Sequence, residues 1–181
     1  TRNPYNPRDY PLLIVISGPS GVGKDSVVRA LESRDHPFHF VVTTTSRPQR
    51  PGEEHGVDYY FVSEERFKDM IANDELLEHA IVYGQHKGVH KKQIREALNS
   101  GEDVVMRLDV QGASTVKSLV EDAVLIFLSA GSEDELKQRL CNRGTETDAE
   151  IKRRLDETKE ELTYLQAFDY LVLNRHNQLD A

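Results

Sequence analysis

The sequence predicts an α/β fold in which short buried strands alternate with amphipathic helices. The apolar run from Leu12 to Ser17 is expected for a strand covered on both faces of a parallel sheet. A glycine-rich turn follows this run directly, and a helix with apolar residues on one face follows the turn. Similar apolar runs return later in the chain, separated by helical stretches. This alternation favours a parallel sheet with right-handed crossovers.

Each predicted element has its own local signal. The first helix is expected from Lys24 to about Glu32, because Val27, Val28 and Leu31 fall on one face. Two more helices are expected to begin after Ser132 and Thr147, since a glutamate three residues further on gives capping-box spacing. Four further strands are expected at the remaining apolar runs: Phe40 to Thr44, Val104 to Leu108, Val124 to Leu128 and Tyr170 to Leu173.

Two segments break this alternation. Residues 45–90 carry short strand-like pieces, one of them Ile81 to Tyr83, with glycine turns and one helix after Ser63, so we expect an inserted lobe. Residues 139–157 are rich in Arg and Glu and are expected to form a lid. We expect a single domain over residues 1–181, with a core made of residues 12–44, 91–138 and 158–181.

Composition narrows the classes of function. The formal net charge of −8 makes the chain a poor candidate for binding nucleic acid or a membrane surface, since both are anionic. No apolar run approaches the length of a membrane span. A single cysteine, Cys141, rules out an internal disulfide and is consistent with a reducing compartment. We expect a soluble, intracellular protein, with a monomer favoured.

A phosphate-binding loop follows the first strand. Residues 18–24 (GPSGVGK) match G-x-x-x-x-G-K, and the strand before and the helix after supply the context that this motif needs. Glycines let backbone N–H groups approach phosphate oxygens, and the helix N-terminus and the lysine add positive charge. The alternative is a glycine turn with an incidental lysine. The expected ATP-binding residues of this phosphate loop are Gly18, Pro19, Ser20, Gly21, Val22, Gly23, Lys24, Asp25 and Ser26.

The phosphate loop departs from its motif at one position. The motif has Ser or Thr after the lysine, to hold Mg²⁺, whereas this chain has Asp25 and then Ser26. One residue is about 100° of rotation on a helix, so Ser26 does not simply substitute. A carboxylate is a good ligand for Mg²⁺, but it also complements a helix N-terminus with no metal involved. Both readings of Asp25 stay open.

Several motifs further along resemble the guanylate kinase family. Residues 43–53 (TTTSRPQRPGE) and 56–61 (GVDYYF) are similar to its acceptor signature, and Leu77-Glu78, residues 108–112 (LDVQG) and residues 139–147 match later motifs. The resemblance runs from Leu12 to Asn174. It implies a P-loop NTPase-type parallel-sheet core in which residues 45–90 bind GMP.

The resemblance also implies roles for individual residues. The GMP-binding residues would be Thr43, Arg47, Arg50, Tyr59, Glu78, Lys87 and Asp109. The catalytic residues would be Lys24, Arg47 and the lid arginines Arg139, Arg143 and Arg154. Asn174 would lie near the adenine of ATP, and Asp109 would lie near the metal, with Asp25 as the other candidate ligand of Mg²⁺.

Elementary chemistry supports these roles. Guanine offers two adjacent donors, N1–H and N2–H, which suit the carboxylate of Glu78, whereas adenine presents an unpaired acceptor there. Arg47 and Arg50 are spaced to fork a phosphate. Phosphoryl transfer to a phosphate that is already ionised needs positioning and charge neutralisation more than a catalytic base.

Three departures accompany Asp25 within the resemblance. Lys87 stands where a phosphate-binding Tyr is usual, Val89 stands where a hydroxyl of the guanine pocket is usual, and Arg107 replaces an acid. With Asp25 this pattern resembles the plant organellar guanylate kinases, which implies a plastid or mitochondrion, with the cytoplasm as the alternative. The expected reaction moves the γ-phosphoryl group of ATP to GMP, with Mg²⁺, giving ADP and GDP. The rival reading is a non-catalytic guanylate-kinase-like scaffold domain that binds phosphopeptides.

Overall fold

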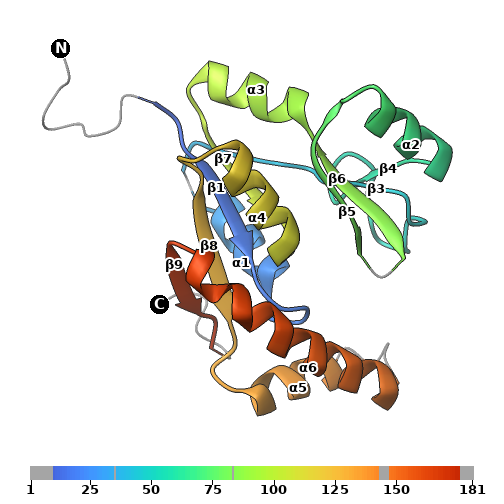
Figure 1. Cartoon of the computed structure of the whole chain (residues 1–181), viewed down its shortest axis with the longest axis vertical. Helices are drawn as coiled ribbons and strands as arrows, with labels where there is room; N and C mark the ends of the chain where they lie inside the picture. The colour runs from blue at the N-terminus through green and yellow to red at the C-terminus, as the bar shows by residue number, and fades with distance from the viewer. Residues whose placement is uncertain (1–9, 35, 83, 143–146, 176–181) are drawn as a thin grey trace, which may run out of the picture. The chain divides into compact units, whose positions relative to one another are not determined.

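The computed structural model describes residues 10–34, 36–82, 84–142 and 147–175. Strands and helices alternate along most of the chain (Figure 1). In chain order they are β1 (Leu13–Ser17), α1 (Lys24–Glu32), β2 (Phe38–Phe40), β3 (Thr44–Thr45), β4 (Tyr60–Phe61), α2 (Glu64–Ala72), β5 (Leu76–Val82), β6 (Gln85–His90), α3 (Lys91–Ser100), β7 (Asp103–Arg107), α4 (Val110–Leu119), β8 (Val124–Ser129), α5 (Glu133–Asn142), α6 (Asp148–Leu162), the 3₁₀ helix η1 (Thr163–Ala167) and β9 (Tyr170–Leu173).

The central sheet confirms the predicted α/β class. Its strand order is β2-β7-β1-β8-β9, and the pairs β2–β7 and β8–β9 are parallel. Val15 and Ile16 of β1 point to opposite faces of the sheet, yet they are 0% and 3% exposed. Both faces of this strand are therefore covered, as the uninterrupted apolar run predicts.

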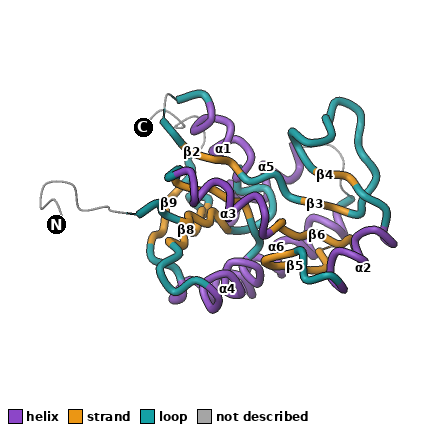
Figure 2. Tube along the Cα trace, turned by 90° about the horizontal axis from the view of Figure 1, so that it is seen from above, coloured by secondary structure: helices purple, strands orange, loops and turns teal. Residues whose placement is uncertain are grey.

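The chain divides into two compact units. The first contains the segment that ends at Ile14, together with Pro37–Met106 and Thr115–Ala123. A four-stranded sheet in the order β4-β3-β6-β5 lies within it, as Figure 2 shows. Helix α2 begins where Ser63 accepts a hydrogen bond from the backbone of Arg66, and its buried face joins Leu76 in a small core. This sheet is formed by residues 44–90, so the acceptor motifs lie on it or beside it.

The second unit contains Val15–His36, Arg107–Ser114 and the chain from Val124 onward. Helices α5 and α6 pack together around Leu136, Leu140 and Ile151 (Figure 1). Thr147 and Glu150 form the predicted capping box at the start of α6. Cys141, near the end of α5, is exposed. None of the helices in the described residues has the length and apolar character needed to span a bilayer.

The predicted strand from Phe40 to Thr44 is wrong. The structure has two short strands there, because β2 ends at Phe40 beside β7 and β3 begins at Thr44 in the other sheet. The piece expected at Ile81 to Tyr83 is the end of the longer β5, whose register shifts between Leu76 and Glu78. Such an irregularity breaks the alternation of inward and outward side chains, which is the local signal for a strand.

Candidate active site

The phosphate loop connects β1 to α1 in the second unit. Gly18 has φ of 136°, and a Cβ atom there would collide with the carbonyl oxygen of Leu128, so only glycine fits. Gly23 occupies the N-cap of α1 with φ of 96° and has no side chain to cap the helix. The N–H groups of the first turn therefore point toward the space where an anion would bind.

Lys24 bends back over this loop. Its Nζ donates to the carbonyl oxygen of Gly18 and, at 2.9 Å, to that of Pro19. Glu161, from α6, lies in the same electrostatic neighbourhood: burial raises the pKa of its carboxyl group, and the Lys24 ammonium opposes that rise. The ammonium group is thus held at the mouth of the phosphate loop, beside a partly buried acid.

The described lid arginines meet the phosphate loop itself. Arg139 donates to the carbonyl oxygen of Val22 at 2.9 Å, and also to Glu135 and to the backbone of Asn174. The side-chain amide of Asn174 donates to the same Val22 oxygen at 2.8 Å. Arg154, from α6, donates to the hydroxyl of Ser20. Arg143 lies outside the described residues.

The two acids expected near the metal have protein partners. Asp25 pairs with Arg107, whose Nη1 lies 2.7 Å from Oδ1 of the carboxylate. Asp109 accepts from the backbone N–H of Gly112 at 2.8 Å and so acts as a cap for α4. Ser26 is exposed on α1. No group of three or more His, Cys, Asp or Glu side chains in the described ranges is placed to hold a metal by itself.

Arg47 is the most constrained of the expected phosphate-binding residues in the first unit. Its side chain is 7% exposed and forms two bonds with Glu53, at 2.5 and 2.7 Å. A third bond goes to the carbonyl oxygen of Pro48. The bond to Glu53 raises the pKa of Arg47, and the same bond lowers the pKa of Glu53. Glu53 therefore fixes the guanidinium group in one orientation.

Tyr59 brings the other basic groups of this cluster together. The guanidinium carbon of Arg47 lies 5.0 Å from the centre of its ring, and Nζ of Lys87 lies 5.9 Å from it. Arg50 is exposed, and its backbone N–H donates to Glu53 at 2.8 Å. Lys87, which departs from the family pattern, thus stays within the predicted phosphate cluster.

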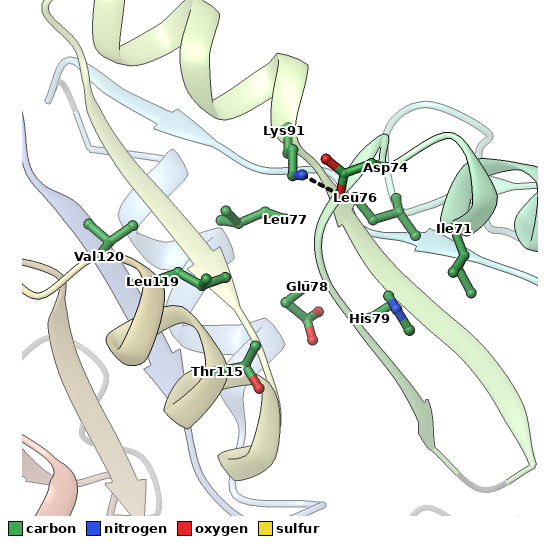
Figure 3. A pocket seen from close by; sticks show the side chains of 10 residues that line it. All are labelled: Ile71, Asp74, Leu76, Leu77, Glu78, His79, Lys91, Thr115, Leu119 and Val120. Atoms are coloured by element: carbon green, nitrogen blue, oxygen red, sulfur yellow. Dashed lines mark ion pairs between the residues drawn. The ribbon is translucent and has the colours of Figure 1, made fainter.

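Glu78 faces a cavity in the same unit. Its side chain is 5% exposed and lies on β5 opposite Val89 of β6, which is fully buried. The cavity has a volume of about 500 Å³, and its lining includes Leu76 and Leu77 of β5 and Leu119 of α4, as Figure 3 shows. The carboxylate of Glu78 points into this space, with Thr115 across from it. Thr43, just before β3, is 6% exposed.

The predicted residues fall into two sets. Apart from Asp109, the expected GMP-binding residues lie in the first unit, whereas the described ATP-binding residues and lid arginines lie in the second. Sequence reasoning missed Glu53, which stands in the acceptor motif without a role, and Glu161. Glu161 follows Arg154 by seven residues, which is about two helical turns, so the two residues lie on the same face of a helix. That spacing could have identified Glu161 from the sequence.

Comparison with known proteins identifies the family to which this chain is similar. The sequence profile of the guanylate kinase family matches residues 10–181. A chloroplastic/mitochondrial guanylate kinase 2 from Oryza sativa subsp. japonica is 48% identical over 179 residues, which cover 98% of this chain and 63% of that protein. A guanylate kinase from Streptococcus pyogenes is 44% identical over 94% of this chain and 81% of its own length.

A solved structure gives the same result at the level of the fold. The crystal structure of guanylate kinase from Anaplasma phagocytophilum is similar with a TM-score of 0.74 and 28% sequence identity, over 94% of this chain and 79% of that one. The predicted resemblance is confirmed, including its similarity to a plant organellar member. This chain belongs to the guanylate kinase family.

Proposed function

We propose that this protein transfers the γ-phosphoryl group of ATP to GMP, giving ADP and GDP. The observation that carries the proposal is the buried carboxylate of Glu78, which faces a cavity in the same unit as the Arg47–Tyr59–Lys87 cluster. A carboxylate that accepts from two adjacent donors suits guanine, and the basic cluster suits its 5′-phosphate. The guanylate kinase relatives support the proposal, although the chain spans only 63% of the rice protein.

Each set of residues has a distinct task in this reaction. Arg47, Arg50 and Lys87 would hold the acceptor phosphate, and Tyr59 would keep two of these cations near one another. Lys24 and the lid arginines would neutralise the charge that builds up on the donor phosphates. Because the acceptor oxygen is already ionised, no proton has to be removed before attack.

Magnesium is the expected partner of ATP. In nucleotide kinases it is typically bound through one or two carboxylates together with substrate phosphates, and it neutralises phosphate charge. Asp25 and Asp109 fit such a donor set, since within the described part of the chain each has one carboxylate oxygen hydrogen-bonded to the protein and a second oxygen available for another ligand. We propose these two acids, with Glu161 nearby, as the protein's contribution to the metal site.

The acceptor assignment can be tested at Glu78. Glu78→Gln is expected to lower kcat/KM for GMP by a factor that corresponds to about 1–3 kcal/mol of lost transition-state stabilisation. The reason is that an amide places a donor against one of the two guanine donors. Glu75→Gln, a nearby carboxylate that pairs with Arg66 at the surface, serves as a matched control and should change little. Unchanged GMP kinetics in Glu78→Gln would remove this residue from the guanine pocket.

The reaction as a whole can be tested with a coupled assay of ADP release. ATP would be supplied with GMP, AMP, CMP and UMP in turn. At low acceptor concentration, ADP release is expected only when the acceptor is GMP. A scaffold domain would release no ADP with any acceptor, whereas a kinase for another acceptor would prefer a different nucleotide. The complete phosphate loop, with Lys24 and its glycines, supports the kinase over the scaffold.

We also propose how the domain is organised and in which compartment the protein works. We assign the acceptor lobe to residues 45–90 and the lid to residues 139–157, within one domain that acts as a monomer without nucleic-acid or membrane partners. The name of the rice relative supports a plastid or mitochondrion as the compartment. Imaging the full-length protein with a C-terminal fluorescent tag would test the location, and a diffuse cytoplasmic signal would contradict it.

A further inference from the structure

Asp25 and Arg107 are two departures from the family pattern that contact each other. Asp25 follows Lys24, where the phosphate-loop motif has Ser or Thr, and Arg107 stands where the family resemblance expects an acid. Although 82 residues separate them in sequence, Nη1 of Arg107 donates to Oδ1 of Asp25 at 2.7 Å. The two departures therefore form one ion pair, in which α1 provides the carboxylate and β7 provides the cation.

Both residues belong to the second unit, and each lies in a helix or a strand. Asp25 lies in the first turn of α1, and Arg107 is the last residue of β7. The backbone N–H of Leu108, the next residue, donates to the carbonyl oxygen of Ile16 in β1 and so fixes the end of β7 beside β1. The end of β7 and the helix that follows β1 are thus neighbours at the carboxyl ends of the strands, where ligands bind in open α/β sheets.

The exposure of the two side chains is unequal. Arg107 is 20% exposed and Asp25 is 58% exposed. Surface ion pairs contribute about 0–1 kcal/mol to stability, so stabilisation alone gives the pair a small role. The ion pair has a clearer effect on the orientation of the Asp25 carboxylate than on stability. Oδ1 is bonded to Arg107, whereas Oδ2 has no hydrogen-bond partner among the described residues. The arginine thereby selects which oxygen faces away from it.

We infer that Arg107 is a positioning residue, which holds the Asp25 carboxylate so that its second oxygen is presented to the Mg²⁺ of the donor nucleotide. This inference rests on the proposed function, and it makes the pair the counterpart of the usual hydroxyl on the helix and acid on the strand. Ligating carboxylates commonly accept a hydrogen bond from such a partner, and removing the partner weakens metal binding.

The test measures metal binding without the acceptor. Mn²⁺ is titrated into the protein saturated with ADP, in the absence of GMP, and free Mn²⁺ is followed by electron paramagnetic resonance. Arg107→Met and Asp25→Asn are each expected to weaken Mn²⁺ binding about tenfold, with Arg107→Lys in between. The double variant is expected to match the single variants, because both remove the same oriented ligand. ADP affinity is measured without metal for each variant and ADP is then kept saturating, so that the Mn²⁺ titration reports metal binding alone.

A matched pair elsewhere provides the control. Arg66 and Glu75 form an arginine–carboxylate pair at 3.0 Å in the first unit, so Arg66→Met should leave Mn²⁺ binding unchanged. Unchanged or tighter Mn²⁺ binding in Arg107→Met would overturn the inference, since Arg107 would then act only as a counter-ion that competes with the metal. Because GMP is absent, this failure is distinct from failure of the acceptor assignment, which the nucleotide panel detects.

Discussion

Lys24→Ala is expected to lower the rate of phosphoryl transfer by about 10²- to 10³-fold, the size of effect seen when one preorganised electrostatic donor is removed. The Lys24 ammonium lies at the mouth of the phosphate loop, where it binds the carbonyl oxygens of Gly18 and Pro19. A bound triphosphate offers this cation full negative charges in place of neutral carbonyl oxygens. The largest loss is therefore expected in the transition state, where charge on the transferred group is redistributed.

GMP binding separates this prediction from a general loss of structure. The expected acceptor residues, apart from Asp109, lie in the first unit, so calorimetric titration of Lys24→Ala with GMP should give nearly the wild-type affinity. Lys24→Met keeps the length of the side chain and controls for lost packing. If GMP affinity fell as far as turnover, the assignment of Lys24 to the donor nucleotide would be wrong.

Arg47→Ala is expected to raise the KM for GMP by about 10- to 100-fold or more, because each hydrogen bond between charged groups contributes about 1.5–3 kcal/mol. The KM for ATP should change little. The variant is also expected to lose stability: Arg47 is 7% exposed and satisfies Glu53, which is only 19% exposed. Leaving one partner of a buried pair alone costs about 3–5 kcal/mol in fully buried cases, and less for this partly exposed acid.

Two neighbouring variants separate binding from stability. Arg50→Ala removes an exposed side chain of the same cluster, so it should raise the KM for GMP without lowering the melting temperature. Glu53→Gln keeps the Arg47 cation but weakens the bonds that orient it, so it should lower the melting temperature together with GMP affinity. Equal rises in KM for ATP and GMP in Arg47→Ala would indicate a structural role alone.

Local patterns predicted the parts of the fold whose signals are local. The helix from Lys24 to Glu32 and the strand from Tyr170 to Leu173 have the predicted bounds. The error at Phe40 to Thr44 has a different cause, since the chain leaves one sheet and enters another within three residues. Which sheet a short strand joins depends on partner strands far along the chain. A segment of five residues contains no information about those partners.

The same limit applies to the candidate site. The phosphate-loop motif and the family resemblance proposed roles for Lys24, Arg47 and Glu78, because each role depends on a residue type within a short signature, and these roles stay predictions. The contact between Asp25 and Arg107 depends on α1 meeting the carboxyl end of β7, and the sequence showed only two unexplained departures. Glu53 is part of the acceptor motif, but its two hydrogen bonds with Arg47 depend on how the intervening turn folds.

Cys141 gives this protein a built-in attachment point for a reporter group. The chain has no other cysteine, and this one is exposed near the end of α5, two residues after the arginine that binds the Val22 carbonyl oxygen. A maleimide dye would therefore label one position in the unmodified protein. Placed on the helix that touches the phosphate loop, the dye would convert the arrival of ATP into a fluorescence change that stopped-flow mixing can time.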